Sequence, residues 1–67
     1  MKAKEIEAVQ EIIRACGFDT MADEYETQTD NRARIAKMVA GYIGRNLKDE
    51  KRANDFMRME RIARLGR

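Results

Sequence analysis

A chain of 67 residues with no histidine, one cysteine and a net charge of +2 excludes most catalytic and metal chemistry. A lone cysteine cannot close an intrachain disulfide, and without histidine there is no common zinc site and no imidazole base. A core of this size supplies only about 3–5 kcal/mol of net stability. We therefore expect a single helical domain over residues 1–67, completed by homodimerisation, with no enzyme activity, no metal and no cofactor.

The composition predicts an all-α fold. The chain has no proline and only four glycines, and helix formers such as Ala, Glu, Lys, Arg and Met dominate it. No stretch alternates apolar and polar residues for long enough to make a strand. We expect a small helical hairpin or a three-to-four-helix bundle. With no secretory leader and no long apolar run, we also expect a cytoplasmic location and no membrane partner.

The first helix is predicted from Ala3 to Cys16. Its apolar stripe consists of Ile6, Val9, Ile13 and Cys16. Gly17 suits the left-handed residue of a Schellman ending, which would bring Phe18 back over Ile13. The position of Cys16 on the stripe indicates a buried structural thiol with no catalytic role.

A second helix is predicted to begin at Asp19 or Thr20, because either side chain can cap free N–H groups there. The segment 26–31, with sequence ETQTDN, has no apolar residue. It is either a solvent-facing turn of one long helix or a break between two helices, and we favour a break. Thr29 or Asp30 could then cap the next helix.

The third helix is predicted to start at Arg32 and to end between Gly44 and Asn46. Its apolar stripe consists of Ile35, Ala36, Val39, Tyr42 and Ile43. Gly41 lies within this stripe, where glycine costs about 1 kcal/mol relative to alanine. We expect Gly41 to allow another helix to approach closely.

The last helix is predicted to start near 47–49, with Asn46 or Asp49 as its cap, and to run to Leu65. Its expected apolar face consists of Ala53, Phe56, Met59, Ile62 and Ala63. Four arginines follow at every third position, at 58, 61, 64 and 67. A three-residue step advances about 300° round a helix, so these arginines cannot form one straight row. Glu60 is expected to pair with Arg64, four residues on.

Charge divides the chain into an acidic and a basic part. Residues 1–29 carry a net charge of −4, and residues 30–67 carry +6. Such an asymmetry favours association with an oppositely charged partner or within a dimer. The candidate surfaces are the acidic segment 19–30 and the basic and apolar face of 51–65.

These features favour a small protein-binding regulator or inhibitor that docks through amphipathic helices. Flexible methionines and apolar side chains rimmed by arginine are typical of protein contacts. Very short helical proteins of phages and mobile elements often block a host factor, which agrees with this interpretation. The predicted partner-binding residues are Phe56, Met57, Arg58, Met59, Arg61, Ile62 and Leu65.

The alternative is a small DNA- or RNA-binding regulator, because the last helix is rich in cations that can neutralise phosphates. The residues for this role are Lys51, Arg52, Arg58, Arg61 and Arg64. Interleaved acidic residues dilute this charge, and no clear helix-turn-helix motif is present. The sequence thus favours a protein partner and leaves nucleic acid as the second hypothesis.

Overall fold

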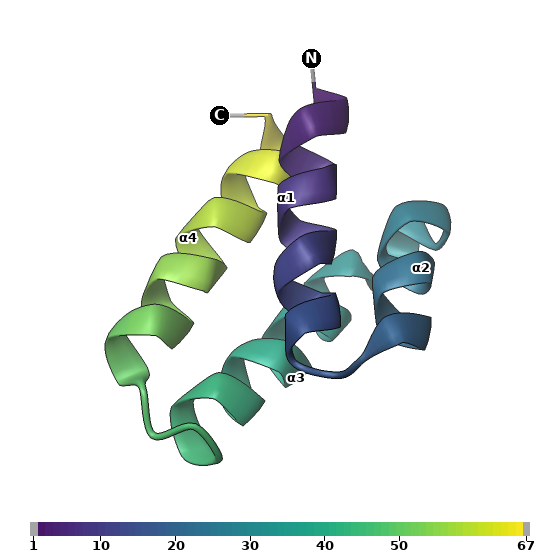
Figure 1. The fold of residues 1–67 in the computed structure, drawn as a ribbon. Helices are drawn as coiled ribbons and strands as arrows, with labels where there is room; N and C mark the ends of the chain where they lie inside the picture. Colours follow the sequence, from purple (N-terminus) through teal and green to yellow (C-terminus); the bar gives the residue numbers. More distant parts are fainter. Residues whose placement is uncertain (1, 67) are drawn as a thin grey trace.

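The computed structural model describes residues 2–66, with only the backbone of Lys2, and these residues fold into α-helices (Figure 1). Their order along the chain is α1 (Lys2–Ala15), α2 (Asp19–Thr27), a 3-10 turn (Thr29–Asn31), α3 (Arg32–Arg45) and α4 (Glu50–Leu65). The all-α prediction is confirmed, with four α-helices in the described part. Homodimerisation stays a prediction.

The four helices enclose one core. Helix α4 packs against α3 and α1, and α1 also packs against α2. In Figure 1, α1 lies between α4 and α2, and the two ends of the chain are at the same end of the molecule. The buried apolar residues are Val9, Ile13, Ala22, Tyr25, Ile35, Ala36, Val39, Ile43, Ala53, Phe56 and Ala63. All four helices contribute to this set, so each helix depends on the others for burial.

Helix α1 ends in the Schellman motif that the sequence predicts. Gly17 has φ +90°, and the Phe18 N–H donates to the Ile13 carbonyl at 3.2 Å. The Gly17 N–H donates to the Arg14 carbonyl at 2.8 Å, which completes the paired hydrogen bonds of this motif. The Phe18 ring then meets the Tyr42 ring of α3 edge-on, with centroids 5.1 Å apart. The turn thereby holds α1, α2 and α3 together.

Helix α2 begins without the predicted side-chain cap. Phe18 occupies the cap position, and Asp19 is already the first helical residue, so capping by Asp19 or Thr20 is wrong. The reason is the short connection, because the Phe18 carbonyl leaves the Schellman turn and at once accepts the Ala22 N–H at 2.9 Å. No residue remains between the two motifs for a capping side chain.

The predicted break between the second and third helices is confirmed. Helix α2 ends at Thr27, and the 3-10 turn leads directly into α3 at Arg32. Capping of α3 by Thr29 or Asp30 is wrong, because Asn31 precedes the helix and makes no side-chain cap bond. The 3-10 turn already supplies a helical entry.

Helix α4 has defined ends on both sides. The Asp49 carboxylate accepts the Arg52 N–H at 3.1 Å, which confirms Asp49 as its N-cap and excludes Asn46. Gly66, with φ +73°, follows Leu65 and ends the helix in the left-handed conformation. Both caps limit fraying of the helix that carries the candidate binding residues.

The first obstacle to a side chain at Gly41 is not another helix. The three atoms nearest to a Cβ atom built at Gly41 belong to the Arg45 guanidinium of its own helix, the closest at 3.1 Å. The contact with α4 occurs at Gly44, where a Cβ atom would lie 3.8 Å from the Ala53 Cβ. A close approach to another helix is therefore seen at Gly44, and the expectation for Gly41 stays a prediction.

Two glycine substitutions should change stability in opposite directions. Gly41→Ala should raise the free energy of unfolding by about 0.5–1 kcal/mol, because alanine is the better helix former and the Arg45 side chain can move. Gly17→Ala should lower it by about 1–2 kcal/mol, because φ +90° is strained for an L-residue. Urea denaturation measures both changes. A destabilised Gly41→Ala variant would show that the Arg45 side chain cannot yield.

Candidate functional site

The inward face of α4 includes a charged residue that the sequence analysis did not place there. The buried residues of this helix are Ala53, Phe56, Glu60 and Ala63. Glu60 is only 1% exposed, whereas Ile62, predicted on the apolar face, is 39% exposed. Met59 lies half-buried at the edge of the core. The spacing of three, four and three residues would have revealed Glu60, had its charge not argued against burial.

Glu60 is held by two donors from different parts of the chain. The Tyr25 hydroxyl of α2 donates to its Oε2 atom at 3.1 Å. The Arg64 Nε donates to the same oxygen at 2.9 Å, which confirms the predicted pairing. Burial raises the pKa of Tyr25, and the charge and hydrogen bond of Glu60 raise it further. Tyr25 thus remains a neutral donor, and the carboxylate keeps both partners.

Two more polar side chains attach α2 to the bundle. The Arg32 Nε donates to the Tyr25 carbonyl at 2.6 Å, and its Nη2 donates to the Glu26 carbonyl at 2.8 Å. The Arg32 guanidinium also lies 5.3 Å from the centre of the Tyr25 ring. The buried Gln10 donates to the Ala22 carbonyl at 2.7 Å. Their hydrogen bonds satisfy main-chain carbonyls, so these side chains position α2 and carry no chemistry of their own.

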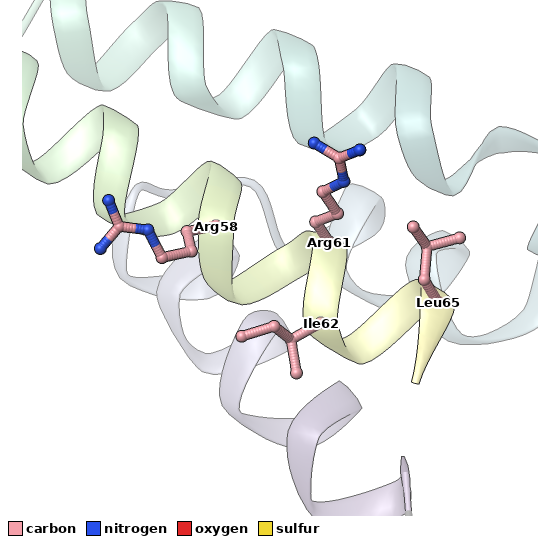
Figure 2. A pocket seen from close by; sticks show the side chains of 4 residues that line it. All are labelled: Arg58, Arg61, Ile62 and Leu65. Carbon is pink, nitrogen blue, oxygen red and sulfur yellow. The ribbon is translucent and has the colours of Figure 1, made fainter. Parts of the chain in front are cut away.

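The opposite side of α4 is open and carries the predicted binding residues. Leu65 is 50% exposed, and a hollow of about 500 Å³ is lined by Arg58, Arg61, Ile62 and Leu65. Figure 2 shows these four side chains leaving one stretch of the helix. A neighbouring hollow of about 410 Å³ shares Arg58, Arg61 and Leu65 and adds Met57, Glu60 and Arg64. We define the outer face of α4 as Met57, Arg58, Arg61, Ile62 and Leu65.

The structure separates the other two predicted partner-binding residues from the outer face. Phe56 is 2% exposed and belongs to the core, so it has no surface to offer a partner. Met59 is half-buried and lines a small cavity of about 140 Å³ with Ile12 and Phe56. The five outer-face residues, in contrast, line the two neighbouring hollows.

The five cations proposed for nucleic acid are not equivalent. Lys51 pairs with Asp55 at 3.6 Å, and Arg64 pairs with the buried Glu60. Arg52 is exposed but lines the small cavity with Ile12 and Met59. Within residues 2–66, Arg58 and Arg61 have no ion pair. The cationic surface of α4 is therefore smaller than the sequence suggests.

Across residues 2–66, no three metal-binding side chains come together. Cys16 is half-buried, less than predicted, and burial raises the pKa of its thiol, with an opposing effect from Arg52. No helix in this part of the chain has the length and apolar character needed to cross a lipid bilayer.

Comparison with protein-family models, with curated proteins and with solved structures gives no match to this chain. A function for it is accordingly inferred from the geometry and chemistry of its own residues.

Loss of one donor to Glu60 should be costly. Tyr25→Phe should lower the free energy of unfolding by about 1–3 kcal/mol, because a buried carboxylate oxygen loses a partner. Replacing both groups, as Tyr25→Phe with Glu60→Met, should restore most of this loss, because apolar groups of similar size need no partner. Tyr42→Phe, the same chemical change outside this pair, serves as the control. Denaturant titration measures all three. Equal losses in Tyr25→Phe and Tyr42→Phe would contradict the role given to this hydrogen bond.

The raised pKa of Tyr25 predicts a loss of stability at alkaline pH. Below pH of about 10, tyrosine is neutral in both the folded and the unfolded chain, so its contribution is constant and fully present. Above that pH the unfolded chain releases the proton while the folded chain keeps it. Stability then falls, by at most about 1.4 kcal/mol per pH unit from this one group. Denaturation at pH 8 and pH 11 should show a smaller gap between wild type and Tyr25→Phe at pH 11; an unchanged gap contradicts the prediction.

Proposed function

We propose that this chain is a non-catalytic regulator or inhibitor that docks on a partner protein through the outer face of α4. One observation carries the proposal: α4 fills the core with one side and leaves a second apolar side open. Met57, Ile62 and Leu65 are 38%, 39% and 50% exposed. Exposed apolar side chains grouped beside arginines are characteristic of protein interfaces.

The residue types of the outer face suit a docking role. Arginine and methionine are enriched in protein interfaces, and arginine often makes a large contribution to binding free energy. Met57 is flexible and can adapt its shape to a partner. Around the hollow, Arg58 and Arg61 can desolvate against a partner while Ile62 and Leu65 bury apolar area.

The rest of the fold supports the same role by fixing how α4 presents this face. Asp49 and Gly66 define the two ends of the helix, and Glu60 ties its inner side to Tyr25 of α2. A preorganised helix loses less conformational entropy on binding than a flexible one. The outer face is thus offered in one orientation.

A nucleic-acid partner is the second candidate, favoured by the exposed Arg52, Arg58 and Arg61. Two of the five proposed cations, Lys51 and Arg64, already neutralise acidic groups of this chain. Affinity for DNA or RNA depends on the number of phosphates neutralised. The internal ion pairs therefore favour the protein partner.

Polar substitutions on the outer face should abolish partner capture without unfolding the protein. Ile62→Asn with Leu65→Asn removes exposed apolar groups, so thermal stability should change little. Cross-linking in an extract of the source cells, followed by mass spectrometry, should recover a protein with wild type and not with this variant. The control is Met38→Asn, because Met38 is 57% exposed on α3 and lies outside the outer face.

Two results would count against the docking proposal. Capture that is equal in the double variant and in Met38→Asn would remove α4 from the interface. Capture of nucleic acid alone, with affinity falling steeply between low and moderate salt, would support the second candidate instead.

A further inference from the structure

The outer face of α4 combines two cations and two apolar side chains in a regular arrangement. Arg58 and Ile62 are four residues apart, as are Arg61 and Leu65, so each arginine has an apolar neighbour one turn further along the helix. In Figure 2, Arg61 and Leu65 point to one side of the α4 ribbon and Ile62 to the other. Among these four residues the two arginines come first along α4, and Ile62 and Leu65 follow. The lining of the hollow is thus cationic in its first half and apolar in its second.

The cationic half of the hollow is complementary in charge to carboxylates on a partner. Among the described residues Arg58 and Arg61 form no ion pair, and the nearest carboxylate along the helix, Glu60, is buried and bound to Tyr25 and Arg64. A guanidinium offers a planar fork of donors that matches a carboxylate in two parallel hydrogen bonds. Complementary charge would also speed the encounter between the two proteins.

The apolar half argues against a phosphate backbone as the occupant. Ile62 and Leu65 are the apolar lining of the hollow. A charged phosphate backbone would not bury their apolar surface favourably. Two cations would also give nucleic acid a weak electrostatic hold, because the salt-dependent affinity grows with each phosphate neutralised.

A second copy of the chain docked face to face is also disfavoured. A two-fold contact of this kind uses the same patch on both copies. Such a contact would bring Arg58 and Arg61 of both copies into one interface, and the lining of the hollow has no accessible carboxylate to pair with these cations. The charge of the face is complementary to an acidic partner and repels a copy of itself.

We infer that the outer face of α4 receives an acidic amphipathic helix of the partner protein, with Asp or Glu opposite Arg58 and Arg61 and apolar side chains opposite Ile62 and Leu65. This inference rests on the proposed docking function and names the chemistry of its partner. Two helices that pack along each other make contact through rows of residues spaced by three and four, which is the spacing of the four residues on α4.

Synthetic helical peptides with a leucine face can test this inference. Three peptides share that face and a single tryptophan, and they carry glutamate, glutamine or lysine at the flanking positions. Because the 67-residue chain contains no tryptophan, fluorescence anisotropy of the peptide reports binding directly. The glutamate peptide should bind at least tenfold more tightly than the glutamine peptide, and the lysine peptide should bind most weakly.

Matched variants locate the contact. Arg58→Gln with Arg61→Gln should reduce binding of the glutamate peptide to the level of the glutamine peptide. Arg52→Gln is the charge control, because this exposed arginine is on the same helix but outside the outer face, and it should leave the affinity nearly unchanged. Ile62→Asn with Leu65→Asn should weaken all three peptides.

The outcomes separate this inference from the docking proposal. If the glutamate and glutamine peptides bind equally well, and neither binds the variant with Ile62→Asn and Leu65→Asn, the inference of an acidic partner helix is overturned. The docking proposal then still stands. If no peptide binds, and partner capture is unchanged in the variant with Ile62→Asn and Leu65→Asn, both the acidic-helix inference and the docking proposal are overturned. The inference is also overturned if a DNA duplex displaces the glutamate peptide at moderate salt. It is overturned as well if the chain alone forms a dimer that dissociates in the variant with Ile62→Asn and Leu65→Asn.

Discussion

The carboxylate of Glu60 is buried in a small apolar core and therefore requires the two donors that satisfy it, Tyr25 and Arg64. An uncompensated buried charge costs several kcal/mol, an amount comparable to the whole net stability of a core this size. Two donors on one oxygen offset that penalty, and one of them comes from α2, 35 residues away along the chain. The contact therefore joins the acidic first half of the chain to the basic second half.

The same contact sets the rotation of α4 about its axis, and that rotation decides which residues meet solvent. Each residue advances about 100° round the helix, so Arg58 and Ile62, two positions before and after Glu60, lie about 160° from it. Leu65 lies about 140° away. With Glu60 directed inward, these side chains must point outward, which agrees with their exposure. A structural interaction in the core thus creates the proposed docking face on the surface.

The remaining helices hold α4 in place with very short connections. The Schellman turn at Gly17 leads into α2 without a linker, and Arg32 binds the carbonyl groups at the end of that helix. Short connections leave little conformational entropy to lose on folding, which matters when the core is small. They also explain why the capping side chains expected at Asp19, Thr29 and Asp30 are not used.

The sequence by itself determined the all-α class and the Schellman ending at Gly17, favoured the break before Arg32, and limited the cap of the last helix to Asn46 or Asp49. These features follow from local backbone preferences and from hydrogen bonds within a few residues, so a pattern of residue types is sufficient to reveal them. Only the tertiary structure decided that Glu60 belongs inside and Ile62 outside, and that Phe56 is withdrawn from the surface. Helix α4 has apolar residues on two sides, so its own sequence does not reveal which side is buried. The side with Glu60 can be buried because the Tyr25 hydroxyl, from a helix distant in the sequence, donates a hydrogen bond to its carboxylate.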